Sequence, residues 1–331
     1  MQSKTIRANG AGLNPIAPMT QASPQAAPHS SPLAPPAFGL LFALGSASFY
    51  GLNIVFARLA SFAGISGSTV VTYRVLLMLV LVGAFALLAR RSLAMARDER
   101  GTMLVLGIST TLVGICYLSS VAYIPVTVAV VVFYTFPILI VLASPFVERT
   151  KLTPALLGVA ALALTGVAMV VGPAFGGLDW RGLALAFGAS IATATQFFAA
   201  ARCRRTGVVA KVFWIHLLVL PTSVAIGWVA GQLGPPSSLG LAPYAIAMTI
   251  GGYVIGFMLQ FLALGRITAV AAGIIYCAEP VVAAVSSAVI LGETFTIVQM
   301  AGGALVLSAI VANVALEQRR MRRSPALTAA E

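Results

Sequence analysis

The sequence predicts an all-α polytopic membrane protein with ten transmembrane helices, and two observations support this fold class. Apolar residues make up 60% of the 331-residue chain and charged residues only 8%, with a mean hydropathy of +1.00. The apolar residues also form long runs almost from end to end, and about 20 consecutive apolar helical residues cross a bilayer. Soluble globular domains carry roughly 25% charged residues. The composition therefore excludes that class.

Ten apolar runs lie between two polar tails. Residues 1–37 are rich in Pro, Ala, Ser and Gln, and we expect a disordered tail there. Its apolar stretches are too short for a signal peptide. Residues 317–331 form a basic C-terminal tail. The expected spans are 38–60, 67–89, 101–122, 126–147, 152–174, 180–202, 208–231, 240–264, 269–291 and 294–316.

The basic residues indicate how the chain is oriented in the membrane. A net charge of +12 could suggest a nucleic-acid partner, but Lys and Arg lie in short loops and form no continuous face. We therefore expect the lipid bilayer to be the partner of the chain, and we expect no nucleic-acid partner. The loops on one side hold nearly all of these residues, and the opposite loops hold only Arg181. Because basic loops stay inside, both termini are predicted to be cytoplasmic.

The two halves of the chain, 38–174 and 180–316, resemble each other. Each half would contain five spans, and since five is odd, the two halves must enter the membrane from opposite sides. Inverted repeats of this kind are a transporter architecture, with the site near the midplane between the halves. Chance matching of small residues in apolar helices is the alternative. The pairs separated by 143 residues are Gly39 and Gly182, Gly45 and Gly188, Asn53 and Gln196, Pro137 and Pro280, and Thr153 and Thr296.

The ninth span carries the most informative residues, Tyr276, Glu279 and Pro280. A carboxylate near the middle of a span raises the free energy of insertion by about 2.5–3.5 kcal/mol. Pro280 has no N–H group, so the Tyr276 carbonyl is expected to lose its helical partner. A freed carbonyl beside a carboxylate suits a cavity better than lipid.

The fourth span mirrors the ninth through Tyr134 and Pro137, with Phe136 where Glu279 stands. We expect these two symmetry-related, proline-interrupted helices to form the two ends of a central cavity, with their tyrosines pointing inward. The alternative is that both prolines only kink helices for packing.

Polar residues in three further spans are candidates for the same cavity. Tyr50, Asn53 and Arg58 lie near one face of the first span, and Gln196 is the repeat partner of Asn53. These side chains would leave donors unpaired in lipid, so they should face the interior. The arginines Arg58 and Arg74 could snorkel to the interface, or attract Glu279 or an anionic group on a substrate. Arg74 lies near the start of its span, so depth argues against a tight pair with Glu279.

Signatures of enzymes and cofactor sites are missing from the sequence. No Gly-x-x-x-x-Gly-Lys phosphate loop, His-Glu-x-x-His or Gly-x-Ser-x-Gly motif occurs. The cysteines are far apart, and Cys203 between two arginines is expected to be an incidental loop residue. We therefore expect no enzyme activity, no metal site and no cofactor. The sequence also lacks the nucleophile–base pair that an intramembrane hydrolase would need.

Together these residues resemble the EamA family of the drug/metabolite transporter superfamily. The matching segments are Tyr50-Gly51-Leu52-Asn53 with Arg58, Tyr73-Arg74, Tyr134 to Pro137 through Glu148, and Ala278-Glu279-Pro280 through Glu293. Where the family usually shows Trp and Lys, this chain has Tyr50 and Arg58. The resemblance covers roughly residues 38–316, and it implies ten spans, a location in the cell inner membrane and export of small metabolites or amino acids.

The resulting hypothesis is a secondary transporter, an exporter working by alternating access of its two halves on a small-molecule substrate. Glu279 is the first candidate for a polar determinant, with Tyr276, Tyr134, Asn53 and Gln196 lining the cavity. Proton coupling is left open, because Glu279 could exchange protons in a low-dielectric site or be held ionised by an arginine. A monomer and a homodimer are both compatible with the sequence. The alternative function is a non-transporting membrane protein, such as a sensor or an assembly subunit.

Overall fold

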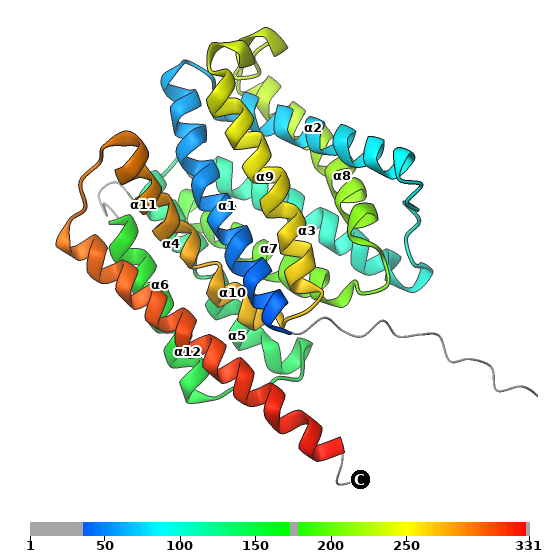
Figure 1. Cartoon of the computed structure of the whole chain (residues 1–331). Helices are drawn as coiled ribbons and strands as arrows, with labels where there is room; N and C mark the ends of the chain where they lie inside the picture. Colours follow the sequence, from blue (N-terminus) through cyan, green and yellow to red (C-terminus); the bar gives the residue numbers. More distant parts are fainter. Residues whose placement is uncertain (1–35, 173–177, 329–331) are drawn as a thin grey trace, which may run out of the picture. The chain divides into compact units, whose positions relative to one another are not determined.

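The computed structural model describes residues 36–172 and 178–328, with side chains over 37–172 and 178–319 (Figure 1). The predicted N-terminal tail lies almost entirely outside these residues. Every regular element in the described ranges is a helix. The α-helices are α1 (Pro36–Phe62), α2 (Gly67–Leu88), α3 (Arg100–Ser120), α4 (Val126–Phe133), α5 (Phe136–Val147), α6 (Pro154–Val171), α7 (Trp180–Arg202), α8 (Val208–Val229), α9 (Pro243–Leu264), α10 (Ala269–Ile275), α11 (Ala278–Leu291) and α12 (Ile297–Thr328).

The fold class predicted from the sequence is confirmed. Ten segments in the described part of the chain are helical, long and apolar enough to cross a membrane, and they lie within a few residues of the predicted spans. A helix satisfies its backbone N–H and C=O groups internally, as the water-free bilayer core requires. Two of the spans are each divided into two helices, α4 with α5 and α10 with α11. The last helix continues beyond the predicted end at 316, to Thr328.

Side chains and glycines at the ends of the helices fix where they begin and stop. Ser66, Thr153 and Thr268 each precede a helix and accept a hydrogen bond from a backbone N–H in its first turn. Gly172 and Gly292 end α6 and α11 with φ of 62° and 71°, a left-handed conformation in which a Cβ atom is strained.

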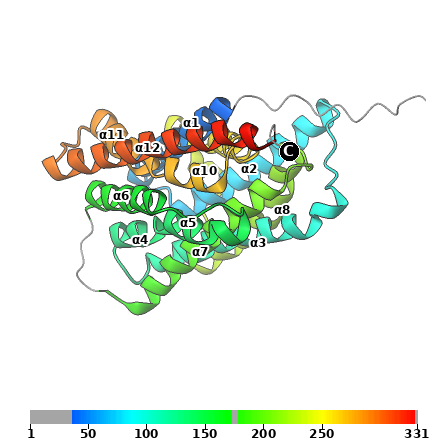
Figure 2. The same cartoon turned by 90° about the horizontal axis from the view of Figure 1, so that it is seen from below.

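The helices pack as the repeat predicts. In Figure 1, α1 (blue) runs beside α9 (yellow), and the pair that the repeat relates to it is α7 with α3. The pairs α2–α8 and α6–α12 each join equivalent helices of the two halves. Figure 2 shows α6 and α12 side by side in a second view. Each half thus contributes one long helix to a pair that is completed by the other half.

Equivalent glycines make equivalent contacts in the two repeats. A Cβ atom on Gly39 would lie 2.6 Å from Cγ2 of Ile267, and one on Gly182 would lie 2.7 Å from Cγ2 of Ile124. The two isoleucines are 143 residues apart, the same offset that relates the two glycines. The same contact thus occurs twice in the fold.

The loops segregate into two ends of the bundle, which we name by their charge. The basic end carries the loops 90–100, 149–151 and 202–211 together with Arg266. These loops contact one another, as when the Ala96 backbone N–H donates to Thr206 Oγ1 at 3.2 Å. The opposite end carries the remaining loops, among which Gly234 N–H donates to Thr69 Oγ1 at 2.8 Å.

Both broken spans bend where the sequence predicts, but one expected consequence is wrong. α10 stops at Ile275 and α11 begins at Ala278, two residues before Pro280. The Tyr276 carbonyl does not lose its partner, because it accepts the Glu279 backbone N–H at 3.0 Å. A tight turn therefore satisfies the Tyr276 carbonyl, to which Pro280 has no N–H to donate. Any polar chemistry at this break comes from side chains rather than from a free carbonyl.

Candidate functional site

Glu279 lies at the break between α10 and α11, surrounded by tyrosines from both repeats. Its carboxylate lies within interaction range of the Tyr134 hydroxyl, which belongs to the equivalent break between α4 and α5. Tyr50, Tyr117 and Tyr276 are also close enough to interact electrostatically with its carboxylate. Glu279 itself remains partly exposed, whereas Tyr134 and Tyr276 are buried. We call Glu279 and these four tyrosines the tyrosine cluster.

The rings of the tyrosine cluster belong to a continuous arc of aromatic side chains. Along this arc, neighbouring ring centroids lie between 5.1 and 6.3 Å apart, the range of favourable aromatic pairs. The arc draws on six of the spans, three from each repeat, and it includes residues at both helix breaks. In order, its members are Tyr117, Phe133, Phe136, Phe197, Tyr276, Tyr50 and Tyr253, and Tyr134 lies beside both Phe133 and Phe136.

Hydrogen bonds to α1 and α9 hold two of the tyrosines in place. The Tyr276 hydroxyl donates to Ser46 Oγ at 2.5 Å, and Ser46 in turn donates to the Gly256 carbonyl at 2.6 Å. The Tyr50 hydroxyl donates to Gln260 Oε1 at 2.9 Å. These bonds fix the two hydroxyl groups without using the Glu279 carboxylate.

Arg74 on α2 supplies a positive charge near the same arc. Its guanidinium carbon lies 4.4 Å from the centroid of the Tyr253 ring, a cation–π arrangement. The Tyr253 hydroxyl is fixed by His216 Nε2 at 2.8 Å, and His216 Nδ1 contacts the Val212 carbonyl at 2.8 Å. The Nε atom of Arg74 is buried and has no hydrogen-bond partner in the structure. Arg74 and Glu279 interact electrostatically but are too far apart for an ion pair, in agreement with the depth argument.

The remaining predicted site residues lie outside the tyrosine cluster. Asn53 is buried beside Gly252 of α9, and its repeat partner Gln196 donates to Thr110 Oγ1 of α3 at 2.8 Å. The two amides therefore occupy equivalent contacts between paired helices. Pro137 and Pro280 are buried at the starts of α5 and α11.

Arg58 lies at the opposite end of the bundle, away from Glu279. Its Nη1 atom forms an ion pair with Glu293 Oε1 at 2.6 Å, and both side chains are more than 40% exposed. The arginine that replaces the common family lysine thus has a partner of its own at this end.

Sequence reasoning gave too little weight to Tyr253 and His216. The sequence does not mark Tyr253 as a site residue, yet it connects Arg74 to the arc. His216 contacts the Val212 carbonyl of its own helix through one ring nitrogen and the Tyr253 hydroxyl through the other. The sequence signal for both residues is that each is a polar side chain within an otherwise apolar span.

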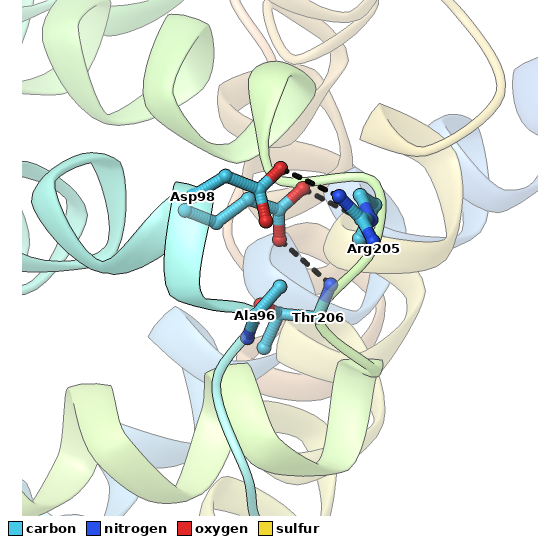
Figure 3. Close-up of polar contacts among 5 residues, drawn as sticks. Ala96, Asp98, Arg205 and Thr206 are labelled. Atoms are coloured by element: carbon cyan, nitrogen blue, oxygen red, sulfur yellow. Dashed lines mark hydrogen bonds and ion pairs between the residues drawn. The ribbon is translucent and has the colours of Figure 1, made fainter.

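A second polar group lies at the basic end, where the loop before α3 meets the loop before α8 (Figure 3). The Glu99 carboxylate accepts the backbone N–H groups of Arg205 and Thr206, both at 2.7 Å. Asp98 forms an ion pair with the Arg205 side chain at 3.0 Å, as Figure 3 shows. Through these bonds Glu99 joins two loops that are distant in sequence, and its side chain is only 7% exposed.

Replacing Glu99 by Gln should destabilise the protein more than replacing its neighbour Asp98 by Asn. A glutamine amide would direct one N–H₂ group at a backbone donor, so about 1.5–3 kcal/mol of charged hydrogen bonding is lost. The exposed Asp98–Arg205 pair should contribute less than about 1 kcal/mol. Apparent melting temperatures in detergent measure both changes. Equal shifts for the two variants would contradict the assigned role of Glu99.

Cys203, at the end of α7, is an inert buried residue. Burial raises the pKa of its thiol to about 11, and this effect outweighs the opposing influence of Lys211. The flanking arginines therefore do not activate it, and the expectation of an incidental cysteine agrees with this environment.

The architecture defines a class of protein. Ten membrane-spanning helices in two inverted halves, with charged and aromatic side chains at two helix breaks, are the architecture of a secondary transporter. The sequence model of the EamA-like transporter family matches residues 37–172 and 180–315, one match in each repeat. The chain therefore belongs to the EamA-like transporter family.

Characterised relatives and a solved structure are similar to this chain. The threonine/homoserine exporter RhtA of Salmonella typhimurium strain SL1344 is 28% identical over 236 residues, covering 70% of this chain and 76% of the relative. The threonine/homoserine exporter RhtA of Escherichia coli K12 is 28% identical over 223 residues, covering 66% and 72%. A crystal structure without a functional name superimposes with a TM-score of 0.71 at 19% identity, covering 85% of this chain and 98% of the other. This last likeness concerns the fold alone.

Proposed function

We propose that the chain is a secondary exporter of small zwitterionic metabolites, of the amino-acid class, in the cell inner membrane. It works by alternating access between its two repeats, with the basic end and both termini in the cytoplasm. Family membership and the similarity to exporters of threonine and homoserine support the proposal. The distribution of basic loops supports the orientation.

One observation carries the choice of substrate class: Arg74 and Glu279 offer opposite charges to the same aromatic arc without pairing. Among the described residues, the ion pairs are Arg58 with Glu293 and Arg205 with Asp98. Arg74 and Glu279 are both of intermediate exposure, so neither residue is fully enclosed by the rest of the protein. A zwitterion carries a carboxylate and an ammonium a few ångströms apart and complements both.

The surroundings suit each end of such a molecule. The carboxylate would accept hydrogen bonds from the Arg74 guanidinium, whose Nε lacks a partner and whose orientation is set by Tyr253. The ammonium would lie beside Glu279, where the faces of Tyr50 and Tyr276 add cation–π attraction. An alcohol or short aliphatic side chain could then contact the remaining rings of the arc.

Transport by the full-length protein in proteoliposomes tests the proposal with matched ligands. Threonine and homoserine should exchange across the bilayer, and the corresponding amines that lack the carboxyl group should exchange about ten- to a hundredfold more slowly, as for the loss of one charged hydrogen bond. Absence of exchange for every amino acid tried would favour the alternative of a non-transporting protein.

Replacing Arg74 by Gln should remove this discrimination. The variant should transport the amino acid at about the slow rate of its carboxyl-free amine, because the partner of the carboxylate is gone. Initial rates for the two ligands measure the ratio. Arg181→Gln is the matched control, since Arg181 is exposed beside Trp180 and lies about 24 Å along α7 from Phe197 of the arc, at 1.5 Å per residue. A variant at Arg74 that keeps the wild-type ratio would rule out the assigned role.

A further inference from the structure

The broken spans are packed differently at the two ends of the bundle. At the basic end, α5 packs directly against α10, and a Cβ atom on Gly273 would lie 3.0 Å from Cδ1 of Ile140. The repeat relates α5 to α11 and α10 to α4. Yet α4 and α11, both fully described, make no comparable contact at the opposite end. The bundle is therefore closed between its broken spans at the basic end and not at the opposite end.

The burial of the two half-helices agrees with this difference. Every residue of α10, from Ala269 to Ile275, is buried. In α11, only Ala278 and Pro280 are buried. Glu279 lies where these two environments meet and is partly exposed. The half-helix toward the basic end is thus enclosed, and the half-helix toward the opposite end is mostly not buried.

A glutamate follows each broken span, and the two glutamates have different partners. Glu148, directly after α5, accepts the backbone N–H of Ala269 at 2.8 Å and so connects the end of α5 to the start of α10. Glu293, just after α11, forms its ion pair with Arg58 instead. The repeat counterpart of Ala269 is Val126, the first residue of α4. The Pro125 cap of α4 provides no side-chain hydrogen bond, whereas Thr268 caps α10.

We propose that Glu148 and Glu293 are the gate residues of this transporter and that they exchange roles between its two states. In the present state, Glu148 closes the basic end by holding the first N–H of α10. In the other state, Glu148 releases α10, and Glu293 leaves Arg58 to accept the first N–H of α4. The two repeats then exchange conformations, as an inverted repeat allows. The proposal rests on the proposed transport function and assigns residues to its conformational step.

Arg58 has a defined part in this exchange. It is an exposed cation on α1 that holds Glu293 away from α4 while the opposite end is open. Because the ion pair is exposed, it contributes little to folding. Its removal should therefore shift the balance between the two states without unfolding the protein.

Backbone hydrogen exchange of the full-length protein in nanodiscs tests the exchange of roles in the absence of substrate. Glu148→Ala should speed exchange in peptides covering 265–276 by about ten- to a hundredfold, the loss expected for one charged hydrogen bond. The same variant should slow exchange in peptides covering 121–134, because α4 becomes capped by Glu293. Arg58→Gln should shift both regions in the same directions, and Arg181→Gln should shift neither.

Two results would overturn the proposal. The first is faster exchange at α10 in Glu148→Ala with no change at α4, which would make Glu148 a static cap. The second is an Arg58→Gln variant that leaves both regions unchanged. Neither result depends on transport, so failure of the gate assignment can be distinguished from failure of the proposed function, which the proteoliposome measurements test separately.

Discussion

Replacing Glu279 by Gln should reduce transport of a zwitterionic substrate by about ten- to a hundredfold, the effect of losing one charged hydrogen bond. Glutamine has nearly the same shape and can still bond the Tyr134 hydroxyl, so the fold should remain intact. The missing negative charge removes the partner of the substrate ammonium. Initial rates in proteoliposomes measure the change, with Asp98→Asn as a carboxylate-to-amide control at an exposed position.

The same variant decides whether protons are coupled to transport through this carboxyl group. If Glu279 exchanges protons during the cycle, the pH dependence of transport should disappear in Glu279→Gln. An unchanged pH dependence would exclude proton coupling at this position. Wild-type rates for zwitterions at every pH would contradict the whole role assigned to Glu279.

Replacing Gly51 by Ala should impair both folding stability and transport. A Cβ atom there would lie 2.5 Å from the Glu279 carbonyl oxygen and 3.0 Å from the Ala283 backbone nitrogen. Backbone atoms cannot move aside as a flexible side chain would, so α1 and α11 must separate. Overpacking of this kind destabilises by about 1–3 kcal/mol. The shift also displaces Glu279, so the transport rate should fall more than stability alone explains.

Gly114→Ala provides the matched control for Gly51. Gly114 also lies within a membrane-spanning helix, and an added Cβ atom there meets nothing within 4 Å. Alanine at an unobstructed helix position should be neutral or stabilising by about 1 kcal/mol. Melting temperatures in detergent and transport rates should therefore separate the two variants. Equal behaviour would show that α1 and α11 are not held in contact at Gly51.

Composition and spacing predicted most of the fold because the bilayer leaves few alternatives. A long apolar run must be a helix, and five spans per repeat must invert. Glu279, Tyr134 and Tyr276 were predictable as one group, since a carboxylate and two symmetry-related tyrosines beside prolines are conspicuous in apolar helices. These residues lie together in the structure.

Other features depend on contacts that no local pattern reveals. Glu99 lies within a charged stretch typical of a solvated loop, and only the docking of the 202–211 loop buries it. The contact of Arg74 with Tyr253 joins α2 to α9, which are far apart in sequence. The proline rule correctly identified the break near Tyr276, but the rule describes a regular helix. It could not foresee the tight turn that satisfies the carbonyl.

The single carboxylate beside the aromatic arc has a consequence for the choice of substrate. Phe136 occupies the place in the first repeat that Glu279 occupies in the second, so the proposed zwitterionic substrate would have one position for its ammonium, beside Glu279. The molecule would keep that orientation while the repeats exchange conformations, and its variable side chain would always face the first repeat. Evolution of a new specificity would then change Tyr117, Phe133 and Phe136 and leave Arg74 and Glu279 untouched. Related chains could come to export different substrates through changes in the first repeat alone.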